Sequence, residues 1–115
     1  MKIDQVRYIG VVKDMERAVS FYRDVVALRV KYRYDQWTEL VFGNAVIALH
    51  GGDTGEHSEI GLSFQVGDIE SAYAEVSAGG GRVVNGPTDR SGERIKLANL
   101  CDTEGNGFTI SQSTG

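Results

Sequence analysis

Apolar and polar residues follow two different spacings along this chain. Apolar residues recur every three or four positions over 15–26, and again from 69 to the glycine run 79–81, which predicts two amphipathic helices. Elsewhere apolar and polar residues tend to alternate, as in strands that bury one face. The expected strands are 6–12, 28–34, 37–42, 45–50, 60–66, 82–84, 94–101 and 107–112, with loops at 86–87 and 102–106.

An internal repeat puts these elements in order. Segments 12–18 and 66–72 share Val, Asp, Glu and Ala at matching places, and their aspartates, Asp14 and Asp68, lie 54 residues apart. Each Asp follows an expected strand and opens an expected helix, so each is predicted to cap the N-terminus of its helix. The repeat therefore predicts two copies of a βαβββ module.

We interpret the chain as one α+β domain, residues 1–115, made of these two βαβββ modules. The modules span about 1–52 and 60–115, and the polar stretch at about 51–59 links them. Each module is too small to bury both faces of its sheet, so modules of one chain or of two chains must pack together.

The two-residue turn Gly43-Asn44 fixes the register of its hairpin and therefore the residues that share a face. One face, expected under the helix, pairs Phe42 with Ala45, Leu40 with Ile47, and Thr38 with Leu49. The other face pairs Val41 with Val46, Glu39 with Ala48, and Trp37 with His50. Its mixture of apolar and polar side chains is typical of a small-molecule pocket wall.

The same alternation assigns faces in the other two central strands. Ile60, Leu62, Phe64 and Val66 are expected under the second helix, which leaves Gly61, Ser63 and Gln65 on the open face, together with Arg7, Ile9 and Val11 of the first strand. We expect the two curved sheets to enclose a cup.

Composition and charge narrow the class of protein. The chain has 115 residues, 41% of them hydrophobic, and its 16 acidic and 12 basic residues give a net charge of −4. Because phosphate binding needs a concentrated basic face, no nucleic-acid partner is expected. We expect no membrane partner and no secretion signal, since the N-terminus is charged and no apolar run approaches ~20 residues. The single cysteine, Cys101, favours the cytoplasm.

Four segments resemble the vicinal oxygen chelate superfamily, the group of glyoxalase I, extradiol dioxygenases, fosfomycin-resistance enzymes and bleomycin-resistance proteins. The segments are 12–22, 64–70, 80–87 and 102–106, the last resembling the D-P-D-G-N loop of the family with Thr103 in place of Pro. The resemblance implies two modules forming a cupped mixed sheet, and a homodimer in which modules of two chains build two equivalent cups. One departure is Ala27, where the family pattern has a helix-ending Gly.

The resemblance also implies where a metal would bind. Metal enzymes of the superfamily place one ligand on the first and last strand of each module, and these positions fall at Arg7, Ala48, Gly61 and Thr109. Arginine stays cationic, and alanine and glycine offer no donor side chain, so we expect no metal and no other cofactor. A shift of register would bring in Gln5 and His50, but the second module would still supply no His or Glu.

Other candidate groups favour structural roles. His50, Asp53, Glu56, His57 and Glu59 crowd the linker, which we interpret as a solvated polar loop rather than a metal site. Cys101 lies in an expected strand with no His nearby in sequence, which favours a buried core residue over a nucleophile.

Three functions remain open. The simplest is a non-catalytic binder, related to the metal-free bleomycin-resistance proteins, that sequesters a bulky aromatic natural product or antibiotic. The alternatives are a metal-dependent glyoxalase, isomerase or dioxygenase, and a metal-free enzyme that uses His50 or Glu39. The expected ligand-binding residues, with no catalytic or metal-binding residue among them, are Arg7, Tyr8, Tyr32, Tyr34, Trp37, Glu39, His50, Ser63, Lys96 and Thr109.

Overall fold

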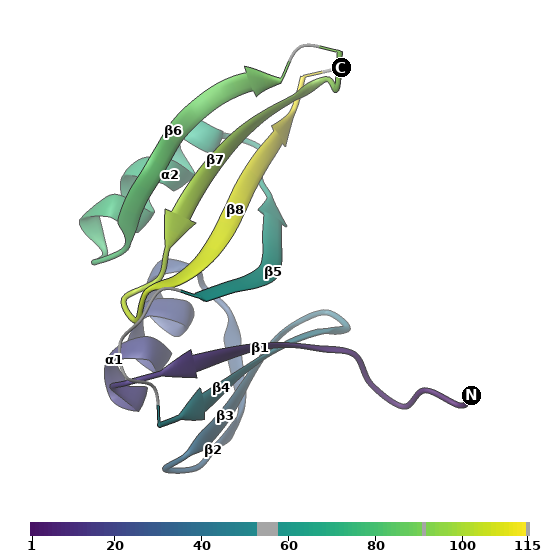
Figure 1. Ribbon diagram of the computed structural model, residues 1–115, viewed down its shortest axis with the longest axis vertical. Helices are drawn as coiled ribbons and strands as arrows, with labels where there is room; N and C mark the ends of the chain where they lie inside the picture. Colours follow the sequence, from purple (N-terminus) through teal and green to yellow (C-terminus); the bar gives the residue numbers. More distant parts are fainter. Residues whose placement is uncertain (53–57, 91, 115) are drawn as a thin grey trace.

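The computed structural model describes residues 1–52, 58–90 and 92–114, and in them the two βαβββ modules are present (Figure 1). The first module comprises β1 (Arg7–Val12), α1 (Met15–Ser20), a π-helical turn η1 (Phe21–Val25), β2 (Arg29–Arg33), β3 (Trp37–Phe42) and β4 (Ala45–Gly51). The second comprises β5 (Ser58–Gln65), α2 (Ile69–Ala78), β6 (Arg82–Arg90), β7 (Ile95–Cys101) and β8 (Asn106–Ser113). The α+β fold class is confirmed.

Each module has its own four-stranded mixed sheet, with strand orders β1-β4-β3-β2 and β5-β8-β7-β6. The first strand of each module runs parallel to the last, and the other pairs are antiparallel. The register predicted from the Gly43-Asn44 turn is confirmed, because Trp37 lies opposite His50 and Phe42 lies opposite Ala45.

The predicted helix caps are confirmed, but the first helix is not uniform. Asp14 and Asp68 accept hydrogen bonds from the N–H groups of Arg17 and Ser71, at 3.0 and 3.1 Å. The helix predicted over 15–26 changes at Phe21, whose carbonyl accepts from the N–H of Val26, five residues on. Such a turn is a local widening of the helix.

Several predicted boundaries differ from the structure. The loop predicted at Gly86-Pro87 lies inside β6, which is an edge strand with register shifts between Val83 and Asn85 and between Asn85 and Thr88. Proline is tolerated there because an edge strand leaves one row of backbone groups unpaired. The predicted linker is shorter at both ends, since Gly51 belongs to β4 and Ser58 and Glu59 belong to β5.

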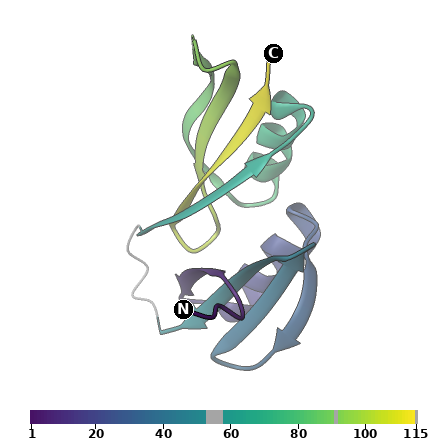
Figure 2. The ribbon, with the colours of Figure 1, turned by 90° about the vertical axis from the view of Figure 1, so that its right-hand side faces the viewer.

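The two modules share one apolar core, and their helix-bearing sides face each other. The rings of Phe21 in η1 and Phe108 in β8 lie 6.3 Å apart. Figures 1 and 2 show α1 on the side of its sheet that is turned toward the second module. Among the described residues, no helix combines the length and apolar character that a membrane span requires.

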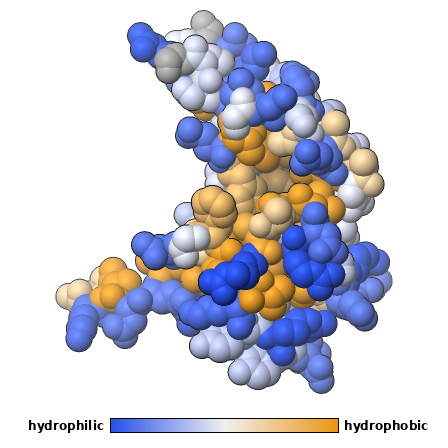
Figure 3. Space-filling model, turned by 180° about the vertical axis from the view of Figure 1, so that it is seen from behind, coloured by the Kyte–Doolittle hydropathy of each residue, from blue (hydrophilic) through white to orange (hydrophobic). Residues whose placement is uncertain are grey.

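A hollow of about 490 Å³ opens between these helix-bearing sides. Its lining includes Ile47 of the first sheet, Leu62 and Phe64 of the second, and Val76 of α2. Figure 3 shows apolar side chains gathered at this waist of the molecule. Phe42, predicted to lie under a helix, lines this hollow instead and is 73% exposed, because η1 ends at Val25 without covering it.

Candidate ligand-binding site

The sheet of the first module leaves one face without a helix, and we call it the aromatic face. Residues paired directly across neighbouring strands point to the same side of a sheet. The pairing therefore forms three rows on this face, and the rows are Arg7–Val46–Val41–Arg29, Ile9–Ala48–Glu39–Tyr32 and Val11–His50–Trp37. Five of the ten residues predicted to bind a ligand lie in these rows.

Trp37 and Glu39 form the centre of the aromatic face. The indole Nε1–H of Trp37 donates a hydrogen bond to Glu39 Oε2 at 2.8 Å. The guanidinium Nε of Arg7 lies 3.7 Å from the same oxygen, so Arg7 and Glu39 form an ion pair. Glu39 is only 6% exposed, and the hydrogen bond from Trp37 and the positive charge of Arg7 compensate for the burial of its carboxylate.

Aromatic rings surround this centre. The imidazole of His50 meets the edge of the Trp37 ring, with centroids 6.1 Å apart and planes at 77°, and Arg7 Cζ lies 5.9 Å from the centroid of the Trp37 ring. Tyr32 and Tyr34 stack at 6.4 Å and are 48% and 62% exposed. Exposed rings held in fixed orientations are suited to stack on a flat aromatic molecule.

The second module brings together only part of its predicted set. The hydroxyl of Thr109 in β8 donates a 2.6 Å hydrogen bond to Ser63 in β5, on the face without a helix. Lys96 does not join them, because it pairs with Gln112, whose side chain accepts a hydrogen bond from the N–H of Ile69 at the start of α2. Lys96 therefore lies on the helix-bearing side, apart from Ser63 and Thr109, and its role in ligand binding stays a prediction.

Tyr8 is likewise separated from the aromatic face. It alternates with Arg7 and Ile9 along β1, pairs with Ile47, and lines the hollow between the modules. Because the helix-bearing sides face each other, the two open faces of one chain point apart. In the described part of the chain, no hydrogen bond, ion pair or ring contact joins the Trp37 cluster to Ser63 and Thr109.

The four positions that would correspond to metal ligands carry other contacts. Arg7 approaches Glu39, and Thr109 bonds to Ser63. Ala48 is fully buried, and Gly61 has a φ of +71° at a register shift of β5. Over residues 1–52, 58–90 and 92–114, no group of three His, Cys, Asp or Glu side chains is arranged to hold a metal. Asp53, Glu56 and His57 of the predicted polar loop lie outside the described residues.

Cys101 has the surroundings of a core residue. It is fully buried, and its Sγ accepts a hydrogen bond from the Arg82 guanidinium at 3.3 Å. Burial raises the pKa of the Cys101 thiol. Since the thiolate is the reactive form, this environment disfavours a nucleophilic role.

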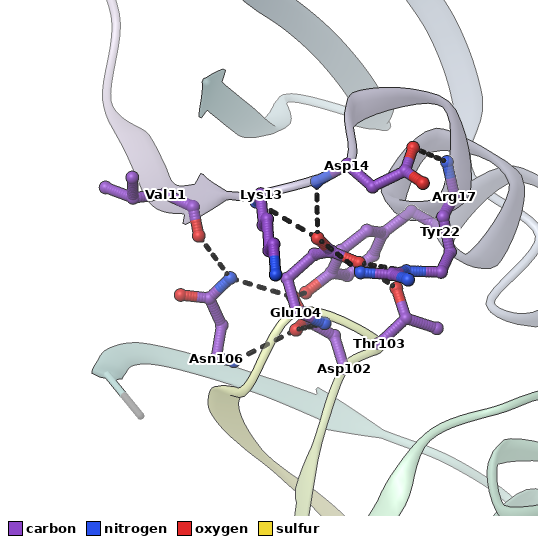
Figure 4. Close-up of polar contacts among 9 residues, drawn as sticks. All are labelled: Val11, Lys13, Asp14, Arg17, Tyr22, Asp102, Thr103, Glu104 and Asn106. Carbon is purple, nitrogen blue, oxygen red and sulfur yellow. Dashed lines mark hydrogen bonds and ion pairs between the residues drawn. The ribbon is translucent and has the colours of Figure 1, made fainter. Parts of the chain in front are cut away.

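A polar joint between the modules was not predicted from the sequence (Figure 4). Glu104 of the 102–106 loop accepts from Arg17 Nε at 2.7 Å and from the backbone N–H groups of Lys13 and Asp14 at 3.0 and 2.7 Å. The carboxylate thus lies at the N-terminus of α1, where the helix dipole favours a negative charge. Burial opposes its ionisation, but the hydrogen bonds from Arg17, Asp14 and Thr103 outweigh burial and lower the pKa of Glu104.

The rest of the joint is built on Asp102. Its carboxylate accepts from the Tyr22 hydroxyl at 2.6 Å and from the N–H groups of Glu104 and Asn106 at 2.8 and 2.9 Å. Asn106 Nδ2 also donates to the carbonyl of Val11 at 2.9 Å. Burial, together with Asp102, raises the pKa of Tyr22 well above its ordinary value, which keeps the hydroxyl a donor. The 102–106 motif was visible in the sequence, but nothing there identified its partners in the first module.

The comparison with protein families agrees with this architecture. A family model described as the glyoxalase/bleomycin resistance protein/dioxygenase superfamily matches residues 2–110. The chain belongs to this superfamily. A comparison with curated protein sequences finds no match.

Solved structures of the superfamily share the fold at low sequence identity. A family enzyme from Burkholderia phytofirmans has a TM-score of 0.82 and 18% identity, with 96% of this chain and 99% of that chain covered. The fosfomycin resistance protein FosX from Listeria monocytogenes has a TM-score of 0.78 and 16% identity, with 100% and 94% covered. TnmS3, an antibiotic binding protein from Streptomyces, has a TM-score of 0.73 and 20% identity, with 98% of each chain covered. At these identities, the matches show the fold alone.

Proposed function

We propose that this protein binds a bulky aromatic natural product or antibiotic on the aromatic face and sequesters it without chemical change. The observation that carries the proposal is the gathering of Tyr32, Tyr34, Trp37 and His50 on one sheet face without a helix. Sequestration requires stacking surface and a few orienting polar groups, and this face supplies both. One structural relative, TnmS3, is described as an antibiotic binding protein, which supports the same class of function.

The residues at the metal positions favour the binder over a metal-dependent enzyme. Arg7 and Thr109 are already engaged, and Ala48 and Gly61 carry no donor atom. The proposal therefore assigns this chain to the metal-free, bleomycin-resistance-like branch of the superfamily. We also propose that the protein is cytoplasmic, because its single cysteine favours a reducing compartment.

The proposed site is completed by a second copy of the chain. The open faces of one chain point apart, and Ile9 and Val11 on the aromatic face are 50% and 37% exposed. In a homodimer, the aromatic face of one copy opposite Ser63 and Thr109 of the other would enclose a ligand from both sides. Light scattering on the purified protein tests this arrangement: a dimeric mass is expected, and a monomeric mass at micromolar concentration contradicts it.

Fluorescence titration tests the binding function, because Trp37 is the single tryptophan of the chain. A panel of flat aromatic antibiotics is titrated into the protein, and quenching of Trp37 with intact recovery of the compound is the expected result. Metal analysis of the same sample distinguishes the metal-dependent alternative. Stoichiometric, tightly bound metal, or conversion of the compound, would contradict the proposal.

Two matched variants locate the ligand. Trp37→Ala is expected to weaken binding at least ~10-fold, or about 1.4 kcal/mol, in a calorimetric titration. Tyr8→Ala removes a ring of similar class from the opposite side of the same sheet and is expected to leave the affinity within about twofold. A large loss of affinity in Tyr8→Ala and little change in Trp37→Ala would place the ligand in the hollow between the modules instead.

A further inference from the structure

A second hollow lies on the aromatic face, beside the Trp37 cluster. It measures about 490 Å³, and its floor is the pair Val41 and Val46. We call it the valine hollow. Its remaining lining residues are Ile3, Asp4, Gln5, Val6, Arg29, Lys31, Gly43 and Asn44, none of which was predicted to bind a ligand.

The valine hollow adjoins the ring-bearing rows of the aromatic face. Val41 and Val46 each lie two residues along their strands from Glu39 and Ala48 in the neighbouring row. Two strand residues span about 7 Å. A rigid molecule of two or three fused rings that stacks near Tyr32 therefore reaches the valine hollow with one substituent.

The charge of the valine hollow is positive. Arg29 lies in the same row as its valine floor, because it pairs with Val41, and Lys31 follows it in β2 with its Nζ 5.3 Å from the centroid of the Tyr32 ring. Asp4 is the single acidic residue of the lining. The carboxylate of Glu39, in the neighbouring row of the sheet, is already compensated by Arg7 and Trp37.

The lining also offers uncharged donors. The side-chain amides of Gln5 and Asn44 carry N–H groups that can donate to an anion beside the two cations. An apolar floor with cations and amides at its edge is suited to a molecule whose ring system ends in an acidic group.

We propose that the ligand of the aromatic face is an aromatic acid, and that the valine hollow, through Arg29 and Lys31, binds its carboxylate. This inference rests on the proposed function, because it specifies the ligand class of the same face. Arg29 and Lys31 select the charge of the ligand, and Trp37, Tyr32 and Tyr34 bind its rings.

Two probes of nearly the same shape, one anionic and one neutral, test the proposal. Anthracene-2-carboxylate and anthracene-2-carboxamide share one ring system, and their affinities are measured by calorimetry with the full chain. We expect the carboxylate to bind about tenfold more tightly. We also expect this preference to shrink between about 20 mM and about 500 mM salt, because salt screens the attraction.

Three exposed residues provide matched variants. Arg29→Gln is expected to weaken carboxylate binding about fivefold and to leave carboxamide binding within about twofold, whereas Asp4→Asn is expected to strengthen carboxylate binding. Arg23→Gln is the control, because it removes the same charge from a guanidinium that is bonded to Asp24 on η1. It is expected to leave both affinities unchanged.

Each other outcome overturns the proposal in a distinguishable way. Equal affinities for the two probes, with Trp37 quenched by both, would overturn the charge selection and leave sequestration on the aromatic face intact. If neither probe bound, both the charge selection and the proposed function would fail. An equal loss of carboxylate affinity in Arg23→Gln and Arg29→Gln would show that net charge, not the valine hollow, is responsible.

Discussion

The indole N–H of Trp37 points at the carboxylate of Glu39, 2.8 Å away, and so the orientation of the largest ring on the aromatic face depends on a buried acid. The two residues lie on one strand, two positions apart, and share a face. The hydrogen bond fixes the indole, and the ring cannot turn toward solvent without leaving the carboxylate short of a donor. A binding surface held in this way loses little side-chain freedom when a ligand stacks on it.

Removing Glu39 should therefore affect both stability and the environment of Trp37. In Glu39→Ala the indole N–H loses its acceptor and the Arg7 guanidinium loses its ion-pair partner, and we expect a loss of about 1–3 kcal/mol in the free energy of unfolding. Urea unfolding followed by Trp37 fluorescence measures the loss, and the emission maximum of the folded protein should shift to the red. Glu39→Gln keeps an acceptor of the same shape and should recover most of the stability.

An exposed acid serves as the comparison for Glu39. Glu93 forms a 2.9 Å ion pair with Arg90, and both side chains are about half exposed. Glu93→Ala should change the free energy of unfolding by no more than about 0.5 kcal/mol, since surface ion pairs contribute little. Equal losses in the two alanine variants would contradict a special role for the Glu39 contacts.

The backbone at Ala27 offers a stabilising substitution. Ala27 has a φ of +70°, two residues after the end of η1, in the left-handed region that disfavours residues with a Cβ. The departure from the family glycine noted in the sequence thus coincides with a strained turn. Ala27→Gly should raise the free energy of unfolding by about 0.5–1 kcal/mol, measured by thermal or urea unfolding.

At a second alanine, substitution by glycine should change the free energy of unfolding in the opposite direction. Ala74 is exposed in the middle of α2, where glycine gains nothing from φ and loses helix propensity. Ala74→Gly should lower the free energy of unfolding by about 1 kcal/mol. If both glycine substitutions lowered the free energy of unfolding, the positive φ of Ala27 would not be a source of strain that glycine relieves.

Local patterns predicted most of the secondary structure and half of the candidate site. The Gly43-Asn44 turn set the register that places Trp37 opposite His50, because a two-residue loop leaves no freedom in the pairing. The aspartate caps could also be predicted, because they are local contacts. The hydrogen bond from Arg17 to Asp14 spans only three residues. Alternation along β3 then separated Glu39 and Trp37 from Leu40.

The arrangement of the modules could not be predicted in this way. It depends on contacts such as the one between Arg17 and Glu104, which are 87 residues apart and belong to different modules. No periodicity encodes such a pair. The side of the sheet on which Lys96 lies could not be predicted for a related reason, since it follows from the pairing of β7 with β8 and not from the alternation of β7 alone. The valine hollow was missed because Arg29 joins it only through its pairing with Val41 in β3.

Glu104 makes the stability of the polar joint between the modules depend on pH. Its side chain has no exposed surface in the ion pair with Arg17, and hydrogen bonds from Arg17, Asp14 and Thr103 lower its pKa below the ordinary value of 4.5. A carboxylate whose pKa is lower in the folded than in the unfolded state stabilises the fold above the unfolded pKa. That contribution is lost as the pH falls through the folded value.

Glu104→Gln should therefore destabilise the protein at neutral pH and matter less in acid. We expect a loss of about 2–4 kcal/mol at pH 7, because the Arg17 guanidinium and two backbone N–H groups lose a charged acceptor. The difference from the unsubstituted protein should narrow as the pH falls below 4.5, the ordinary pKa, and through the lower pKa of Glu104 in the folded protein, where the carboxylate becomes protonated. Urea unfolding at a series of pH values measures it, with Glu93→Gln as the exposed control. A difference that stays constant down to the acid limit would mean that packing, and not the charge of Glu104, holds the modules together.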